Sequence, residues 1–405
     1  MHESECQYTM KTKKNITDNI RYVGTDHADL DLFESQYPVP NGISYNSFLI
    51  VDEKVAILDT VDHRKSSEWW SNITEALEGR TPDYLIVQHV EPDHAGCIGK
   101  VVDRYPQIEV MASERAAQIL AQMYRFPQLF ERIRVVKEGD TLSLGRHRLQ
   151  FMMAPMVHWP EVMVTYEQTE KILFSADGFG TFGILNDAIT DATGSGAWPN
   201  EARRYYYNIC GKYGAPVQSL LKKIAALDIR YICPLHGPIL TEDLAHYIGL
   251  YDKWSRYEAE SEGVLIAYAS IHGYTATAAH ILKELHFRHK GTEVRVMDLA
   301  RCDMSEAVTE AFRMKHMVLA ASSYDGGLFT PMYEFLHRIQ IKGYKGRRVG
   351  IIENGSWAPS AGRVMREMLA SMKDIDIVEP MVTLRSTLQP ENIPSMQALA
   401  KALLA

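Results

Sequence analysis

The chain has few cysteines, and none of them are close neighbours. Its 405 residues include five cysteines, and no two form a C-x-x-C pair. This spacing excludes a disulfide scaffold and a cysteine-rich zinc or iron–sulfur site within the chain. Because disulfides persist only in oxidising compartments, the low count also fits a reducing one. We therefore expect a cytoplasmic location.

Long apolar runs and an excess of positive charge are also missing. No apolar run approaches the roughly 18 residues that cross a bilayer, and the first fourteen residues lack the apolar stretch of a signal peptide. The formal net charge is −8, whereas nucleic-acid binding needs a basic face to neutralise phosphates. The composition, 46% hydrophobic and 23% charged, is that of an ordinary soluble protein. We expect no membrane partner and no nucleic-acid partner.

Two patterns of secondary structure divide the chain. In the first part, the apolar runs at residues 43–51 and 55–61 are joined by a short polar turn, which predicts a hairpin. Strands and helices mix there in a way that suits a layered α/β arrangement with a largely antiparallel sheet sandwich. From Gly263 onward, apolar strands alternate with helices, which is typical of a doubly wound parallel sheet. We predict two domains, at residues 1–253 and 254–405.

Four side chains that can bind metals follow the apolar run at residues 84–87. The segment QHVEPDHAG contains His89, Glu91, Asp93 and His94. Alternating positions after a strand project to one side, so the first three can converge on one point while the fourth approaches from the adjacent turn. Such groups are costly to bury without a cation between them. The alternative interpretation is a solvated polar loop.

Three later residues follow the same pattern. His158, Asp177 and His236 each come directly after a predicted strand, at a sheet edge where loops gather. A single histidine at any one of these positions is more often structural. Together with the first segment, however, they make four placements of metal-binding side chains after strands. We therefore favour a shared metal site over coincidence.

With these residues, the sequence resembles the metallo-β-lactamase superfamily and, within it, the flavodiiron proteins. Zinc hydrolases of the superfamily carry histidine where Glu91 stands, and a carboxylate there favours iron over zinc. The resemblance covers nearly the whole chain, including residues 29–53. It implies an α/β fold with an N-terminal metallo-β-lactamase-like αβ/βα sandwich, followed by a C-terminal flavodoxin-like doubly wound parallel sheet.

The resemblance also implies the metal ligands. One iron would be bound by His89, Glu91 and His158, the other by Asp93, His94 and His236, with Asp177 bridging the two irons. In some relatives, the residue equivalent to His94 swings away from the metal.

Three loops of the second domain predict a different ligand. They follow the first, third and fourth strands, at the carboxyl edge where flavodoxin-like folds bind theirs. Neither G-x-x-x-x-G-K-S nor G-x-G-x-x-G is present, so nucleoside triphosphates and Rossmann dinucleotides lack their main support. The loops together resemble the FMN site of flavodoxin. The candidate FMN residues are Ser270, His272, Gly273, Tyr274 and Thr275; Ser322, Ser323, Tyr324, Asp325 and Gly326; and Gly355, Ser356, Trp357 and Ala358.

Each part of this flavin interpretation has a simpler alternative. The first loop offers N–H groups and hydroxyls to a phosphate at a helix start, but many helices begin in this way for capping alone. Tyr324 and Trp357 can flank a flavin ring, whereas a single aromatic residue more often serves ordinary packing. The stretch NGSWAPSAG departs from the G-S-Y-G-W of most flavodiiron proteins, and Pro359 stiffens it.

The resemblance implies an oxidoreductase with two irons and one FMN per subunit, which reduces dioxygen to water. Nitric oxide is the family's other substrate, and the sequence leaves both open. Because no C-x-x-C pair is present, we expect no appended rubredoxin and therefore a separate electron donor. The chain looks closest to methanogen enzymes that oxidise the reduced deazaflavin coenzyme F-420, with rubredoxin as the alternative donor. We also expect a head-to-tail homodimer, alone or paired into a tetramer.

Two other classes of function could use some of these residues. A zinc hydrolase would use the same loops, but Glu91 and the flavin loops argue against it. An electron carrier that uses only FMN would leave seven metal-type residues without a role. We rank both below the oxidase.

Overall fold

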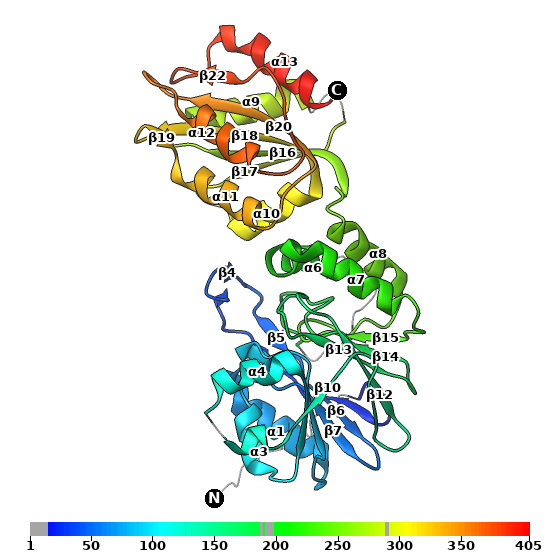
Figure 1. The fold of residues 1–405 in the computed structure, drawn as a ribbon. Coiled ribbons are helices and arrows are strands. Elements are labelled where there is room, and N and C mark those ends of the chain that lie inside the picture. Colours follow the sequence, from blue (N-terminus) through cyan, green and yellow to red (C-terminus); the bar gives the residue numbers. More distant parts are fainter. Residues whose placement is uncertain (1–14, 126, 187–188, 191–197, 288–290) are drawn as a thin grey trace, which may run out of the picture. The chain divides into compact units, whose positions relative to one another are not determined.

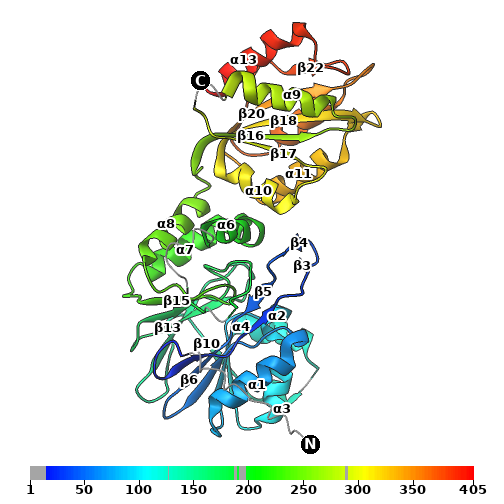
Figure 2. The same ribbon diagram turned by 180° about the vertical axis from the view of Figure 1, so that it is seen from behind.

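The structure, a computed structural model, describes residues 15–125, 127–186, 189–190, 198–287 and 291–405. The chain divides into two compact units (Figures 1 and 2). The first takes its described residues from 1–31, 39–198 and 226–244, and the second from 32–38, 199–225 and 245–405. The expected boundary at 253/254 falls inside helix α8 (Leu244–Ser255). The domain boundary therefore stays a prediction.

The first unit contains a six-stranded mixed sheet. Its order is β1 (Ile20–Tyr22), β6 (Phe48–Val51), β7 (Val55–Leu58), β8 (Tyr84–Val87), β9 (Glu109–Ser113) and β10 (Ile133–Val136). Strands β6 and β7 pair antiparallel, which confirms the predicted hairpin. Strands β7 to β10 are mutually parallel, so their carboxyl ends meet at one edge.

A five-stranded sheet faces the first one. Its order is β11 (Thr141–Ser143), β12 (Arg148–Met153), β13 (Met163–Glu167), β14 (Ile172–Phe174) and β15 (Tyr231–Cys233). Fully buried side chains from both sheets, among them Phe48, Phe151 and Phe174, form one core between them. A short pair, β2 (Thr25–His27) and β5 (Ile43–Tyr45), lies outside these sheets.

Helices cover the outer face of the six-stranded sheet. The helices between its strands are η1 (His63–Lys65), α1 (Ser66–Leu77), α2 (Pro92–Ala95), α3 (Ile98–Arg104), α4 (Glu114–Met123) and α5 (Pro127–Phe130), of which α1 and α4 contact the sheet. Both ribbon views show α1, α3 and α4 on the same side of this sheet (Figures 1 and 2). Helix α1 buries Trp69, Ile73 and Leu77, which share one face at four-residue spacing. The first unit is thus a sandwich of helices and two sheets.

The second unit is built on a parallel sheet. Its main order is β17 (Val294–Asp298), β16 (Ser261–Ala269), β18 (Met314–Tyr324), β20 (Arg347–Asn354) and β21 (Ile375–Ile377). Two short strands that we did not predict, β19 (Gly327–Leu328) and β22 (Val382–Leu384), pair with β18 and β20. The reversal of strand order next to β16 confirms the doubly wound topology.

Helices lie on both faces of this sheet. On one face are α9 (Tyr274–Leu282), continued by η3 (Lys283–Phe287), and α13 (Ile393–Leu403), preceded by η5 (Pro390–Asn392). On the other are α10 (Met304–Arg313), α11 (Thr330–Ile341) and α12 (Ala361–Ala370). The ribbon views show these two helical layers (Figures 1 and 2). No helix in the described ranges is both long and apolar enough to cross a membrane.

The second unit also takes in elements from earlier in the chain. They are β3 (Leu32–Phe33), β4 (Tyr37–Pro38), α6 (Trp198–Ile209), η2 (Gly211–Tyr213), α7 (Gly214–Ile224) and most of α8. Direct contacts explain this grouping. Tyr207 stacks on Phe312 with ring centroids 4.6 Å apart, and Arg204 Nη1 donates to Ser305 Oγ at 3.1 Å.

Candidate functional site

The seven predicted metal ligands come together in the first unit as two neighbouring groups. One group is His89, Glu91, His158 and Asp177, and the other is Asp93, His94 and His236. Within each group the candidate ligand atoms lie within 4.8 Å of one another. Six of the seven residues are buried, and Glu91 is partly exposed. The two groups meet at Asp177, whose Oδ1 lies 3.3 Å from His94 Nε2.

Strand direction explains why these residues meet. His158 follows β12, Asp177 follows β14 and His236 follows β15. Because β12 and β14 are each antiparallel to β13, and β15 is parallel to β14, the three strands end at one edge of the five-stranded sheet. His89 follows β8 of the facing sheet. Glu91 is the N-cap of the short helix α2, and that helix carries the remaining two ligands.

Several buried polar atoms in the site need a cation. Neither carboxylate oxygen of Asp93 has a hydrogen-bond donor among the described residues, and neither does Oδ1 of Asp177. The Nε2 atoms of His94 and His236 lie 3.0 Å apart. Because Nδ1 of His236 donates to Ser44 O at 2.7 Å, the lone pair of its neutral ring is on Nε2. A metal ion between these atoms would accept all of these lone pairs.

Asp177 lies where a bridging carboxylate is needed. Its Oδ2 is 3.0 Å from His158 Nε2 in one group, and its Oδ1 faces His94 in the other. Glu91 connects the histidines of the first group, with Oε2 at 3.2 Å from His89 Nε2 and 3.1 Å from His158 Nε2. Asp177 could therefore contribute an oxygen to both groups of ligands, and Glu91 could share a metal with both His89 and His158.

The carboxylates give the site a negative electrostatic potential. Burial alone would lower the pKa of His158, but Asp177 and Glu91 raise it to about 9. Burial likewise opposes the charged form of Asp177, yet the surrounding imidazoles hold its pKa well below the usual value for aspartate. The raised pKa of His158 reflects the negative potential of the carboxylates, which favours a positive charge at this position.

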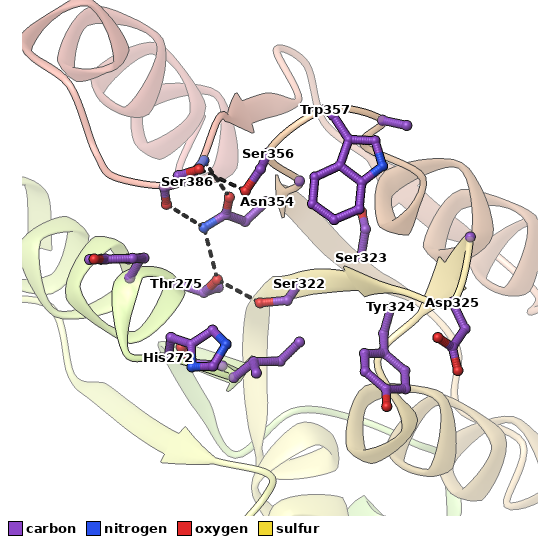
Figure 3. Close-up of a pocket in the computed structure, with 16 residues that line it drawn as sticks. His272, Thr275, Ser322, Ser323, Tyr324, Asp325, Asn354, Ser356, Trp357 and Ser386 are labelled. Carbon is purple, nitrogen blue, oxygen red and sulfur yellow. Dashed lines mark hydrogen bonds between the residues drawn. The ribbon is translucent and has the colours of Figure 1, made fainter.

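The predicted flavin loops surround one pocket of the second unit. It is a cavity of about 500 Å³, a volume typical of small-molecule sites. Every predicted flavin residue lines it except Gly273, which is the N-cap of α9 with a φ of 88°. Three lining residues were missed by sequence reasoning: Ile271, Asn354 and Ser386. Figure 3 shows hydroxyl and amide groups at one end and the rings of Trp357 and Tyr324 at the other.

The exposure of the two aromatic rings in this pocket indicates whether they serve core packing or can contact a ligand. Trp357 is 88% exposed and Tyr324 is 49% exposed, so core packing does not account for either ring. Ser323 has a structural contact, because its hydroxyl accepts from the backbone N–H of Ser360 at 2.9 Å and of Ala361 at 3.1 Å. It thereby caps the start of α12. A flat ring with a polar tail fits the pocket's two ends.

Comparison with known proteins finds relatives that are similar to most of the chain. The chain matches the family model described as ODP family beta lactamase over residues 43–237. An uncharacterized protein of Methanocaldococcus jannaschii is 30% identical over 321 residues, 79% of this chain and 80% of that protein. An anaerobic nitric oxide reductase flavorubredoxin of Aeromonas hydrophila is 27% identical over 369 residues, 90% of this chain and 74% of that protein.

Two solved structures share the fold over almost the whole chain. A rubredoxin oxygen:oxidoreductase from Desulfovibrio gigas aligns with a TM-score of 0.90 at 24% identity, covering 97% of this chain and 98% of that one. A flavodiiron protein from Giardia intestinalis aligns with a TM-score of 0.90 at 22% identity, covering 98% and 97%. The chain belongs to the flavodiiron protein family. The predicted order of a metallo-β-lactamase-like unit and a flavodoxin-like unit is thereby confirmed.

Flavodiiron proteins carry a diiron site and FMN, and the residues of this chain fit both groups. Three carboxylates among seven candidate ligands form a donor set harder than the all-nitrogen and sulfur sets that select zinc or copper. The orphaned oxygens of Asp93 and Asp177 lie where cations would neutralise them. The flavin pocket offers both a polar and an aromatic end.

Sequence reasoning missed two supporting carboxylates in this flavodiiron protein. Glu161 Oε1 accepts from His89 Nδ1 at 2.7 Å and from the backbone N–H of Val90 at 3.0 Å. Asp59, at the end of β7, accepts from the backbone and side-chain N–H groups of Gln88, each at 2.8 Å. Burial raises the pKa of Asp59 to about 6, although the bonds from Gln88 oppose the rise. Asp59 could have been found from the sequence, because it directly follows β7, the strand next to β8.

Proposed function

We propose that this flavodiiron protein reduces dioxygen to water, with electrons passed through FMN from the reduced deazaflavin coenzyme F-420. The observation that carries the proposal is a buried, carboxylate-rich metal site in the same chain as an open flavin pocket. When bound, two irons and one FMN supply four electrons, the number that converts dioxygen to two water molecules.

The ligand assignment follows the two groups of side chains. We assign one iron to His89, Glu91 and His158, the other to Asp93, His94 and His236, and the bridge to Asp177. Hydrogen bonds from Nδ1 orient two of the imidazoles, since His89 donates to Glu161 and His236 donates to Ser44 O. In both rings Nε2 is then the nitrogen that faces the other candidate ligands. Nδ1 of His94 has no such partner among the described residues.

Nitric oxide reduction is the second candidate. The Aeromonas relative is named for nitric oxide reduction, and the Desulfovibrio protein of the same fold is named for oxygen reduction. We rank oxygen first on the resemblance to methanogen oxidases.

The flavin pocket supports a small-molecule donor. Trp357 stands exposed at its aromatic end, and none of the described residues that line it is lysine or arginine. A flat deazaflavin ring can stack on such a surface. Rubredoxin is the alternative donor, in line with the names of the relatives. We further propose a head-to-tail homodimer, alone or paired into a tetramer, in the cytoplasm.

An anaerobic titration followed by gas uptake tests the function. The purified protein, with its iron and flavin content measured, is mixed with reduced F-420, NADH or reduced rubredoxin, and flavin bleaching at 450 nm is followed. We expect fast bleaching by reduced F-420 and none by NADH. The reduced sample is then given oxygen or nitric oxide. Four electrons consumed per oxygen, without hydrogen peroxide, is the expected result.

A Glu91→Ala variant separates the two halves of this test. It should still be bleached by the donor, because residue 91 lies in the first unit and the flavin pocket in the second. It should lose water formation and release peroxide instead. Bleaching by rubredoxin alone would refute the deazaflavin donor, and unchanged water formation by the variant would refute the diiron site. Sedimentation at the mass of one chain, with full activity, would refute the dimer.

A further inference from the structure

The flavin pocket has a fourth wall beyond the three predicted loops. Ser386 lies in the connection between β22 and α13, and it lines the pocket together with Asn354, the last residue of β20. The side chain of Asn354 bonds the backbone of Ser386 in both directions (Figure 3). Its Nδ2 donates to Ser386 O at 2.8 Å, and its Oδ1 accepts from Ser386 N at 3.0 Å.

Ser386 needs this support because its backbone is strained. Its φ is 70°, in the left-handed region that residues other than glycine rarely adopt. The two bonds from Asn354 hold the residue in that conformation. Its hydroxyl also lies 2.7 Å from the hydroxyl of Ser356, which belongs to the loop after β20. The pairing of β22 with β20 brings this segment beside the third flavin loop, and the buried Asn354 amide and the Ser356 hydroxyl attach Ser386 itself.

Asn354 also bonds the first flavin loop. Because the N–H of Ser386 fixes Oδ1 on one side, Nδ2 must face the other, where it donates to Thr275 Oγ1 at 3.2 Å. An amide nitrogen cannot accept, so the Thr275 oxygen is the acceptor in this bond. The Thr275 hydroxyl hydrogen is left to point toward Ser322 Oγ, 3.0 Å away, or into the pocket. Asn354 thus sets the direction of a row of hydroxyl groups.

This row lies at the end of the pocket suited to a phosphate. Thr275 is in the first turn of α9, where backbone N–H groups and the helix dipole favour an anion. Among the described lining residues there is no lysine or arginine to attract one. Neutral donors must therefore be correctly oriented to hold a phosphate.

We propose that Asn354 is the positioning residue for the phosphate of FMN. It holds the Ser386 wall in place and leaves the Thr275 hydroxyl to donate, either directly to the phosphate or to Ser322 Oγ, in which case the Ser322 hydroxyl is the donor to the phosphate. Asn354 itself is buried, and its side chain bonds one side-chain and two backbone partners.

Flavin affinity tests the proposal. The full-length, iron-loaded protein is stripped of flavin and titrated with FMN or with riboflavin, which lacks the phosphate, and flavin fluorescence reports the dissociation constant. Asn354→Leu removes all three bonds, so we expect FMN to bind about tenfold more weakly. Asn354→Asp keeps the size but cannot donate and adds a negative charge. It should weaken FMN about tenfold more than it weakens riboflavin.

Two further variants isolate the cause. Asn392 bonds the same β22–α13 connection, through Gln389 N and Thr383 O, but does not line the pocket. Asn392→Leu is therefore the matched control, and FMN affinity should stay within about twofold. Adding Ser386→Gly to Asn354→Leu should recover about threefold of the lost affinity, because glycine adopts a φ of 70° without strain.

Each result supports or overturns a defined part of the proposal. FMN binding within about twofold of wild type for Asn354→Leu, or equal weakening by Asn392→Leu, overturns the positioning role. Equal weakening of FMN and riboflavin by Asn354→Asp overturns the phosphate part. No recovery with Ser386→Gly overturns the role of the fourth wall. If Asn354→Leu fails to fold, the comparison of FMN with riboflavin binding in Asn354→Asp still tests whether Asn354 acts on the phosphate.

Discussion

The Nδ1 atom of His89 lies 2.7 Å from Oε1 of Glu161, and both side chains are completely buried. This bond fixes the tautomer of a candidate iron ligand, because a carboxylate can only accept. A second histidine–glutamate pair has the same form but belongs to neither group of candidate metal ligands. His147 Nδ1 lies 3.1 Å from Glu167 Oε1, and both side chains are fully buried. The two pairs allow a metal role and a purely structural role to be compared within one chain.

Glu161→Gln should weaken iron binding. The neutral amide accepts a weaker hydrogen bond from His89 and lowers the basicity of the ring, so iron affinity should fall roughly 10- to 100-fold. Iron retention against a chelator measures this. Glu167→Gln is the control and should retain iron as the wild type does, although it weakens the same kind of bond. Equal iron loss in both variants would show that the effect is one of folding.

Glu91→His should change the metal preference. Replacing the carboxylate by imidazole makes the donor set resemble that of zinc hydrolases, so the iron-to-zinc ratio should fall when both metals are supplied. Elemental analysis of protein reconstituted with equal iron and zinc measures the ratio. Glu109→His on the exposed start of β9 is the control and should leave it unchanged. An unchanged ratio in Glu91→His would exclude residue 91 from the metal site.

FMN binding should depend little on salt. Because the described lining of the pocket contains no lysine or arginine, few ion pairs are available to be screened. Between about 0.05 M and about 0.5 M sodium chloride, the dissociation constant should change by about twofold or less. A steep rise with salt would place an unidentified cation at the phosphate.

Glu167 should make the stability of the first unit depend on pH. Burial raises its pKa, but bonds from His147, Glu170 N and Thr169 N lower it more, so the folded pKa lies below the ordinary value. A lowered folded pKa means that the ionised form stabilises the fold. This contribution is complete above about pH 4.3 and is lost as the pH falls through the lower folded pKa.

Urea unfolding measures this dependence. At pH 7, Glu167→Gln should lower the free energy of unfolding by about 2 kcal/mol, and the difference from wild type should shrink below about pH 4. Arg146→Gln is the control, since its ion pair with Glu170 is at the surface and should contribute less than about 1 kcal/mol. A difference that stays constant down to pH 3 would contradict an ionised Glu167.

Much of the fold and the candidate metal site could be predicted because the signals are local. The strands β8 and β16 can be recognised from short apolar runs in the sequence. His89 to His94 lie in one short segment directly after β8. Residues that follow strands of the same direction gather at one edge of a sheet, so the pattern also predicted His158 and His236. The short strand β22 was missed because three residues carry too little periodicity to be recognised.

Other features depend on contacts between residues far apart in the chain. Glu161 reaches His89 across 72 positions, and Asn354 reaches Thr275 across 79. No local pattern marks such partners, because they are chosen by strand register, sheet order and burial. The same holds for α6, whose apolar and polar residues reveal a helix but not that it packs on α10. The amino-acid pattern thus determines which side chains can bind metal and flavin, and only the packed fold determines which neighbours orient them.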